Sequence, residues 1–163
     1  MDRTAAQTSW IGVISDTHGL LRPEAASALA GAQHIIHAGD VGSSEVLENL
    51  RKIAPVTAVR GNVDEGDWAR QLPLTAKVEA EGRVLFVLHD VHELALDPAA
   101  VGFAAVISGH SHTPLEELRD GVLYLNPGAA GPRRFKLPVT LAKLYLDSSG
   151  LRAEFVELVR IVT

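Results

Sequence analysis

Two histidines separated by one residue give this chain its clearest chemical signal. His110 and His112 directly follow the apolar run 103–107, which is typical of a buried strand. Neutral imidazole is the commonest side-chain ligand for transition metals. Two such ligands leaving a strand at positions i and i+2 can point to different places in one metal cluster. The pair therefore predicts a metal site whose other ligands come from elsewhere in the chain.

Further candidate ligands follow other apolar runs. The chain has no cysteine, so thiolate sites are excluded and a metal must be held by His, Asp, Glu, Asn or backbone oxygen. Such ligands suit Mn, Fe, Zn or Mg. The candidates are Asp16, His18, Asp40, Asn62, His89, His110 and His112. One metal takes about four to six ligands, so this set fits two adjacent metals better, with a carboxylate such as Asp40 as a bridge.

Each candidate also has a structural alternative. An isolated aspartate at a strand end more often caps a helix or forms a turn, and an asparagine after glycine is a turn residue by default. His89 alone could be a core histidine with satisfied hydrogen bonds. Their joint occurrence after successive strands favours the metal site. His34 and His37 lie within an apolar strand, and we interpret them as packed or supporting residues. His92 receives no role.

Composition predicts one soluble domain spanning residues 1–163. The chain is 47% hydrophobic and 21% charged, which is ordinary for a globular protein. Residues 1–9 are polar, lack the apolar core of a signal peptide and are expected to form a flexible extension. No run approaches the roughly 20 apolar residues of a membrane span, so we expect a cytoplasmic protein without a membrane partner. The net charge of −5 argues against a nucleic-acid partner.

The elements that must position the ligands alternate in the first half of the chain. Strands are predicted at 10–15, 34–38 and 56–60, with helices at 25–30 and from Ser43 or Ser44, as the capping residue, to about Lys52. This order indicates parallel strands joined by right-handed crossovers. Ligand sites in such sheets lie beyond the carboxyl ends of the strands, where Asp16, Asp40 and Asn62 are found.

Hairpins are predicted in the second half. The runs 75–80 and 83–88 flank Glu81-Gly82, and the runs 115–119 and 122–125 flank Asp120-Gly121. A short helix is expected from Asp97-Pro98 to about Gly102, and the strands 139–146 and 151–158 close the chain. The predicted architecture is an α/β fold with two facing mixed sheets, helices outside them and all ligand loops at one end.

Five motifs together resemble those of a known enzyme family. S-D-T-H-G at 15–19, G-D at 39–40, G-N-x-D at 61–64, G-H-S-H at 109–112 and N-P-G at 126–128 are similar to the calcineurin-like metallophosphoesterases. The resemblance is closest to their small YfcE/MJ0936-like phosphodiesterase branch and extends from Trp10 to Leu158. It implies a four-layer α/β/β/α sandwich of the metallo-dependent phosphatase-like type. It also implies a dinuclear centre, most often active with Mn²⁺, with Ni²⁺, Co²⁺, Zn²⁺ or Fe as alternatives.

The resemblance assigns the ligands to two metals. Asp16, His18, Asp40 and His112 would hold one, and Asp40, Asn62, His89 and His110 the other. The chain departs from the family at three positions. Val63 stands where many phosphomonoesterases carry a histidine, which the phosphodiesterase branch also usually lacks. Asp90 replaces a usual glycine, and Ala129 stands where the branch often has serine.

The expected function is hydrolysis of small phosphodiesters by in-line attack of a hydroxide bridging the two metals. Asn62 and one of the arginines after the N-P-G turn, Arg133 or Arg134, would bind the phosphate; exposed, solubilising arginines are the alternative. The same fold is known as a non-catalytic interaction scaffold in Vps29, which is the alternative function. Retention of all seven ligands favours the enzyme, and a nuclease is disfavoured by the acidic charge. The sequence leaves open whether the protein forms a homo-oligomer.

Overall fold

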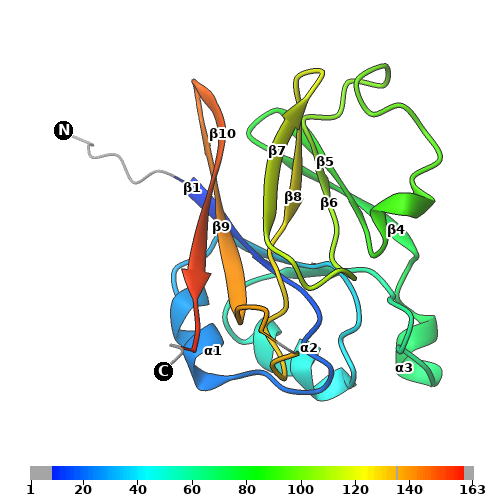
Figure 1. Ribbon diagram of the computed structural model, residues 1–163, viewed down its shortest axis with the longest axis vertical. Coiled ribbons are helices and arrows are strands. Elements are labelled where there is room, and N and C mark those ends of the chain that lie inside the picture. Colours follow the sequence, from blue (N-terminus) through cyan, green and yellow to red (C-terminus); the bar gives the residue numbers. More distant parts are fainter. Residues whose placement is uncertain (1–8, 135, 160–163) are drawn as a thin grey trace.

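Two five-stranded mixed sheets face each other in the computed structural model, which describes residues 9–134 and 136–159. Figure 1 shows strands β1, β9 and β10 on one side and β4 to β8 on the other. The first sheet contains, in spatial order, β10 (Gly150–Glu157), β9 (Thr140–Asp147), β1 (Ser9–Ile14), β2 (His34–His37) and β3 (Val56–Ala58). The second contains β4 (Thr75–Ala80), β5 (Arg83–Leu88), β6 (Ala105–Ile107), β8 (Val122–Asn126) and β7 (Leu115–Arg119). The predicted pair of mixed sheets is confirmed.

Each sheet has a parallel centre. β1, β2 and β3 are parallel, as are β5, β6 and β8, while β9, β10, β4 and β7 pair antiparallel at the edges. The crossovers between the parallel strands of the first sheet contain α1 (Pro23–Leu29) and α2 (Ser44–Arg51). Parallel strands send their carboxyl ends to the same edge, so the loops after them lie together.

The main core lies between the sheets. It is built from inward-facing residues at alternate strand positions, such as Ile11 and Val13 of β1 and Leu85 and Val87 of β5. These four side chains are at most 2% exposed. Burial of such side chains contributes roughly 1.5–3 kcal/mol each to folding. The sandwich is therefore held along its whole inner surface, and the loops at its end start from fixed positions.

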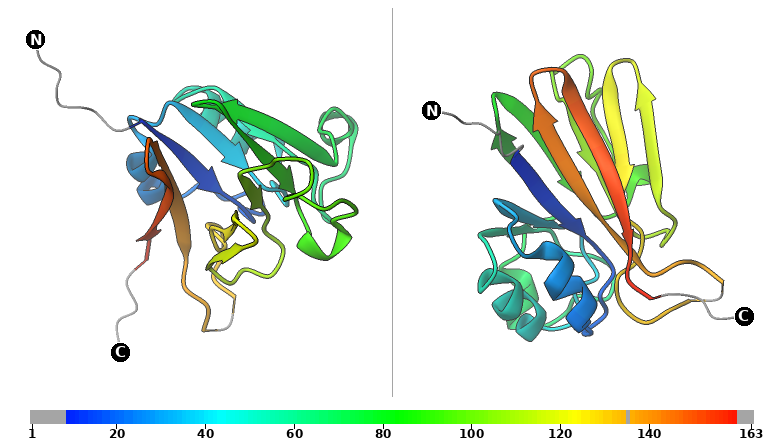
Figure 2. Two further views of the ribbon diagram at one scale, coloured as in Figure 1. Left: turned by 90° about the horizontal axis from the view of Figure 1, so that it is seen from above. Right: turned by 90° about the vertical axis from the view of Figure 1, so that its left-hand side faces the viewer.

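Helices cover the outer face of the first sheet. Leu29 of α1 and Leu50 of α2 pack on Ile14 and Ile35, and Figure 2 shows both helices gathered on one side of the strands. Gly12 of β1 permits the close approach, because a Cβ atom there would lie 2.3 Å from Cδ2 of Leu29. On the outer face of the second sheet, the described residues contribute one helical turn, η1 (Val91–Glu93), through Val91.

Four details differ from the sequence-based expectations. Residues 97–102 form a turn, closed by the Val101 N–H to the Asp97 carbonyl, because Gly102 leaves the helical region with a φ of 81°. The one-turn helix α3 (Asp67–Arg70) was not predicted. Ser43 occupies the N-cap position of α2 without a capping bond from its side chain. Ser9 belongs to β1, so the predicted extension 1–9 is wrong at its last residue, and residues 1–8 lie outside the described part.

Both predicted hairpin turns are confirmed. Glu81 and Gly82 join β4 to β5 with φ angles of 51° and 75°, and Asp120 and Gly121 join β7 to β8 with 50° and 80°. Two consecutive residues with positive φ match the right-handed twist of the flanking strands. Across residues 9–134 and 136–159, the helices are all too short or too polar to cross a membrane.

Candidate metal centre

The predicted ligands lie in loops that follow parallel strands of both sheets. The first sheet contributes the loops after β1, β2 and β3, and the second contributes those after β5 and β6. These loops carry Asp16 and His18, Asp40, Asn62, His89, and His110 with His112. The hydrogen bond from the Gly109 N–H to the His89 carbonyl and that from the His110 N–H to Asp16 tie the loops to one another. The candidate site is thus assembled between the two sheets at one end of the sandwich.

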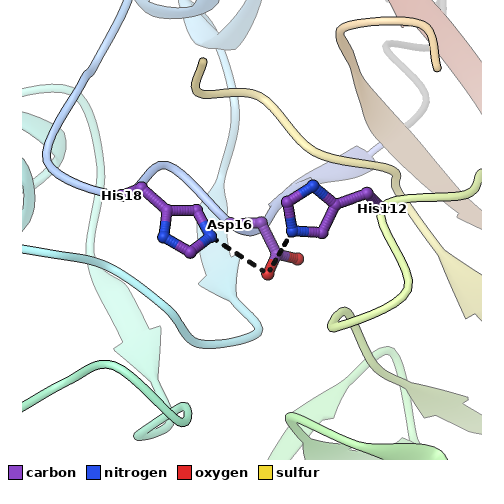
Figure 3. A group of neighbouring side chains, drawn as sticks. All are labelled: Asp16, His18 and His112. Atoms are coloured by element: carbon purple, nitrogen blue, oxygen red, sulfur yellow. Dashed lines mark ion pairs between the residues drawn. The ribbon is translucent and has the colours of Figure 1, made fainter. Parts of the chain in front are cut away.

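Asp16, His18 and His112 form a first group. Nε2 of His112 lies 3.4 Å from Oδ1 of Asp16, and Nε2 of His18 lies 3.8 Å from the same oxygen. Figure 3 shows both imidazole rings directed at that oxygen. One ligand atom from each of the three residues lies within 4.8 Å of the others. This spacing fits three ligands around one cation.

Asp16, Asp40 and His89 form a second group with the same spacing. Nε2 of His89 lies 3.2 Å from Oδ2 of Asp40 and 3.9 Å from Oδ1 of Asp16. The first group is close by, because Nε2 of His18 lies 3.7 Å from Oδ2 of Asp40. Asp40 therefore lies near both His18 and His89, the two histidines that the family resemblance assigns to different metals. Asp16 also reaches both groups, which the sequence did not predict.

Several buried polar atoms here have no hydrogen-bond partner among the described residues. They are Oδ1 of Asp16, Nε2 of His18, Nε2 of His89 and Nδ1 of His112. Buried polar groups in folded proteins are nearly always satisfied, and leaving one unpaired costs about 1–3 kcal/mol. A divalent cation would satisfy the atoms of Asp16, His18 and His89 together, whereas Nδ1 of His112 points away from Asp16, which its Nε2 faces. The residues present therefore fit a metal centre.

The backbone dihedrals mark the same residues. Asp16, His18, Asp40, His110 and His112 have φ angles of 54°, 46°, 56°, 72° and 63°. Positive φ is uncommon outside glycine and costs roughly 1–2 kcal/mol per residue. The other non-glycine examples in the described ranges, Glu81 and Asp120, are the two hairpin-turn residues. Backbone strain of this kind persists where the surrounding structure enforces it, and it concentrates at functional sites.

Hydrogen bonds fix the direction of the ligand atoms. Oδ2 of Asp16 accepts from the Ser15 hydroxyl at 2.7 Å and from the His110 N–H at 3.1 Å, so Oδ1 is the oxygen left for the histidines. Nδ1 of His89 lies 2.7 Å from the Ala38 carbonyl, which can only accept. In neutral His89 the proton is therefore on Nδ1, and the Nε2 lone pair faces Asp40. A ring fixed in this way is ready to bind a metal.

Asp40 and His89 are also coupled electrostatically. Burial raises the pKa of Asp40, but the close approach of His89, the hydrogen bond from the Val63 N–H and the charge of His18 lower it to about 2. Burial lowers the pKa of His89, but the nearby carboxylates of Asp40 and Asp16 and the hydrogen bond to the Ala38 carbonyl raise it above the ordinary value. Without a metal, the site therefore attracts a proton to His89, and a bound cation must displace that proton.

Two glycines in the motifs are required by close contacts. A Cβ atom on Gly61 would lie 2.2 Å from Oδ1 of Asp40, and one on Gly109 would lie 2.0 Å from the Ser15 hydroxyl oxygen and 2.6 Å from Oδ2 of Asp16. Real Cβ atoms essentially never come this close. The glycine before each candidate ligand therefore lets one loop pass directly against an aspartate from another.

Asp64, quoted in the G-N-x-D motif without a role, joins two of the loops. Its carboxylate accepts from the N–H groups of Val41 at 3.2 Å, Gly42 at 2.9 Å and Gly61 at 2.8 Å. It is only 6% exposed. Charge-assisted bonds to backbone N–H groups are among the stronger ones. Asp64 thus fixes the loop that carries Asp40 to the loop that carries Asn62.

Asn126, from the N-P-G motif, holds the histidine loop in the same way. Its side-chain NH₂ donates to the Gly109 carbonyl at 2.9 Å and to the Ser111 hydroxyl at 3.0 Å, and its oxygen accepts from the Gly128 N–H. With Asp64, it is a positioning residue that the sequence analysis did not identify. The presence of Asp64 and Asn126 in two of the quoted motifs could have marked them as important. Their hydrogen bonds in the folded structure show which loops they hold.

His37 supports the loop of Asp16 from beneath, as the sequence analysis predicted for a packed or supporting residue. Its Nδ1 accepts from the Gly39 N–H, so its Nε2–H donates to the Thr17 hydroxyl at 3.0 Å, which in turn donates to the Val41 carbonyl. Burial lowers the pKa of His37 to about 4 despite the opposing charges of Asp16, Asp64 and Asp40. His37 is therefore a neutral, fully buried ring that links the loops after β1 and β2.

Three predicted residues lie outside the two groups. The side chain of His110 is 44% exposed, with its ring centroid 5.2 Å from that of His89 and its Nε2 3.8 Å from Oδ2 of Asp90. Asn62 is exposed, although the next residue, Val63, donates its N–H to Asp40. Arg134 is also exposed. All three are at least partly exposed, and their roles as ligand or phosphate contact stay predictions.

Comparison with known proteins finds relatives along most of the chain. Residues 10–149 match the family model of the calcineurin-like phosphoesterase superfamily domain. The chain is 36% identical over 159 residues to a probable metallophosphoesterase from Methanothermobacter thermautotrophicus, covering 90% of this chain and 91% of that protein. It is 31% identical over 140 residues to the phosphodiesterase YfcE from Escherichia coli, covering 71% and 76%.

A solved structure shows a similar fold at lower sequence identity. Vps29 from Chaetomium thermophilum aligns with a TM-score of 0.71 at 17% identity, covering 91% of this chain and 97% of that one. An alignment at this identity carries the fold alone.

Proposed function

The chain belongs to the calcineurin-like phosphoesterase superfamily, and on that premise we propose that it is a metal-dependent phosphodiesterase acting on small phosphodiesters. The observation that carries the proposal is the pair of carboxylate–imidazole groups that meet at Asp16 and Asp40. The phosphodiesterase name of the Escherichia coli relative supports the reaction class. The cytoplasm remains the proposed location, on the sequence composition.

We assign the ligands to two ions as the family resemblance implies. Asp16, His18, Asp40 and His112 hold one ion, and Asp40, Asn62, His89 and His110 hold the other. The position of Asp40 near both His18 and His89 supports its role as the shared ligand. When bound, two divalent ions, with Mn²⁺ favoured, supply the positive charge that polarises the phosphoryl group and activates a water nucleophile.

The chain's own residues set what can be hydrolysed. Asn62 and Arg134, both exposed, are the proposed phosphate contacts. Val63 follows Asn62, is 47% exposed and has no proton to give to a leaving alkoxide. The leaving group must then be protonated by water or by another group, which favours esters of acidic alcohols. This reasoning supports aryl phosphodiesters as the best first substrates.

Turnover of bis(4-nitrophenyl) phosphate with Mn²⁺, Ni²⁺, Co²⁺ or Zn²⁺ tests the proposal. We expect activity in the wild type and its loss in Asp40→Asn and His110→Ala, together with a lower metal content. Asp67→Asn is the matched control, because the Asp67 side chain is 93% exposed. If no tested metal supports turnover by the wild type, the enzymatic proposal is wrong.

The similarity of fold to Vps29 carries a second candidate, a protein-interaction scaffold. Such a role does not need the buried, unpartnered ligand atoms of Asp16, His18 and His89. The scaffold is therefore the less favoured function. It becomes the better one if the purified protein retains no metal and the Asp40→Asn variant is unchanged.

A further inference from the structure

A pocket of about 300 Å³ opens beside the candidate metal centre. We propose that this Tyr124 pocket, lined by Asp90, His110, Leu115, Arg119 and Tyr124 among others, binds one ester group of the substrate and selects an aromatic or similarly flat apolar group. The inference rests on the proposed phosphodiesterase function and goes beyond it by naming the substrate class. Pockets for small organic groups are mainly apolar with a few well-placed polar atoms.

The pocket adjoins the loop that carries two of the predicted ligands. Gly109, His110 and Ser111 line it, and the same loop supplies His112 to the first ligand group. His110 lines the pocket, and its ring centroid lies 5.2 Å from that of His89. A phosphodiester whose phosphate lies at the two ligand groups therefore directs one of its ester groups past His110 into the pocket.

A flat wall forms the far side. The guanidinium carbon of Arg119 lies 4.5 Å from the centre of the Tyr124 ring, and its NH2 nitrogen bonds Glu117 at 2.9 Å. Arg119 is thereby held over the ring, and its charge is balanced by that of Glu117. Leu115 adds an apolar side chain that is 42% exposed. Rings pack well against such aromatic and guanidinium faces.

Asp90 lies at the rim shared by the pocket and the metal centre. Its Oδ1 accepts from the His92 N–H at 3.0 Å, which leaves Oδ2 facing His110 at 3.8 Å. The pocket thus offers a hydrogen-bond acceptor from Asp90 and donors from Arg119.

Strand β7 provides a matched pair of variants. Side chains alternate between the two faces of a strand, and Leu115 and Arg119 line the Tyr124 pocket. Glu116 and Leu118 point to the other face and line a different pocket, near Leu151. Leu118 is 71% exposed. Leu115→Glu therefore places a charge in the proposed pocket, and Leu118→Glu places the same charge on the same strand outside it.

Calorimetric titration of the Mn²⁺-loaded protein with phenylphosphonate and methylphosphonate tests the pocket without turnover. We expect the wild type to bind phenylphosphonate about tenfold more tightly, from the burial of the ring. Leu115→Glu should abolish the preference and Leu118→Glu should keep it. Leu115→Trp, which fills the pocket with a neutral side chain, should also abolish it. Equal affinities in the wild type, or equal losses in both glutamate variants, would overturn the inference.

Kinetics with one constant leaving group separate this inference from the proposed function. Phenyl 4-nitrophenyl phosphate and methyl 4-nitrophenyl phosphate differ in the retained group, so we expect a kcat/KM ratio of about ten that falls toward one in Leu115→Glu. Turnover of both esters with no phenyl preference would overturn the pocket alone. A phenylphosphonate preference without turnover would overturn the phosphodiesterase, and the absence of both would overturn both.

Discussion

Each of the two central aspartates uses one carboxylate oxygen for the protein and presents the other to the histidines. Asp16 binds the Ser15 hydroxyl and the His110 N–H through Oδ2, and Asp40 accepts the Val63 N–H through Oδ1. The opposite oxygens face His18 and His89. The direction of the free oxygen is thus fixed by neighbours before any ion binds, which lowers the entropy lost on binding.

Asp16→Asn should destroy metal binding more completely than loss of a single outer ligand. Oδ1 of Asp16 belongs to both ligand groups. In Asp16→Asn the side-chain NH₂ takes the place of one of the two oxygens. It then points either at the histidines or at the Ser15 hydroxyl and the His110 N–H, which are themselves donors. We expect the affinity for Mn²⁺ to fall at least ~100-fold, since losses of even supporting residues reach 10–100-fold. Competition with a metal-sensitive dye measures this, and Asp67→Asn should bind normally. A tenfold loss or less would contradict the shared role of Asp16.

His37 should make the stability of the metal-free protein depend on pH. Its pKa falls from 6.5 to about 4 on folding because the ring is buried, so between these values the unfolded chain binds more protons. The free energy of unfolding therefore rises with pH across this window, and His37's contribution is lost as pH falls toward 4. A pKa shift of this size corresponds to roughly 3 kcal/mol of unfolding free energy.

Urea unfolding in EDTA at pH 4.5, 5.5 and 6.5 checks this expectation. In His37→Gln, the slope of unfolding free energy against pH should be smaller than in the wild type. The difference should correspond to the uptake of up to one proton on unfolding, or about 1.4 kcal/mol per pH unit. His34→Gln is the control, since this histidine is less buried and contacts Thr57 on β3 rather than the site loops. Identical slopes for wild type and His37→Gln would show that His37 is not the group responsible.

At the scale of elements, sequence reasoning worked best where apolar runs end at a turn signal. β4 and β5 were predicted to the residue because Glu81 and Gly82 separate two such runs, and β1 and β2 were predicted to within one residue at each end. Segments of a single turn were not predicted correctly, as α3 and residues 97–102 show. A single turn gains too few hydrogen bonds to be specified locally, so its conformation depends on tertiary contacts.

The candidate site was predictable in residue type and less so in direction. Strand-end motifs placed Asp16, Asp40 and His89 together because parallel strands end at one edge. A linear pattern does not contain the rotation of a side chain. His110 therefore turns out to be half exposed beside Asp90, and the buried contacts of Asp64 to three N–H groups were not foreseen.

Asp64→Ala should loosen two loops at once. Three backbone N–H groups, from Val41, Gly42 and Gly61, would lose their acceptor, and the variant should lose about 3–5 kcal/mol of unfolding free energy. Asp64→Asn, which keeps one oxygen, should lose less. Urea unfolding measures both. Asp67→Ala, three residues along and exposed, is the control, and a loss for Asp64→Ala within 0.5 kcal/mol of it (about the error of such comparisons) would contradict the role.

At the scale of the whole molecule, the candidate centre joins the two sheets at one end. Asp16 and Asp40 follow strands of the first sheet, whereas His89 and His112 follow strands of the second. The apolar core holds the sheets together along their inner faces, but at the ligand end the contacts are charged groups and strained backbone. A cation there replaces repulsion between two carboxylates with shared coordination, so its binding should stabilise the fold as a unit.

Metal removal should therefore lower the melting temperature, because metal binding is coupled to folding. This coupling should require ligands from both sheets. A ligand present at 100 times its Kd stabilises the native state by about 2.7 kcal/mol, which for a chain of this size corresponds to roughly 5–10 °C. We expect EDTA to lower the Tm of the Mn²⁺-loaded wild type by this amount. His89→Ala, which removes a second-sheet ligand, should melt at the same temperature with Mn²⁺ or EDTA, whereas Asp67→Asn should keep the full shift. Scanning calorimetry at fixed protein and Mn²⁺ concentrations gives the comparison. A wild-type shift that persists in His89→Ala would show that the stabilising ion binds elsewhere and that the two sheets are not linked through this centre.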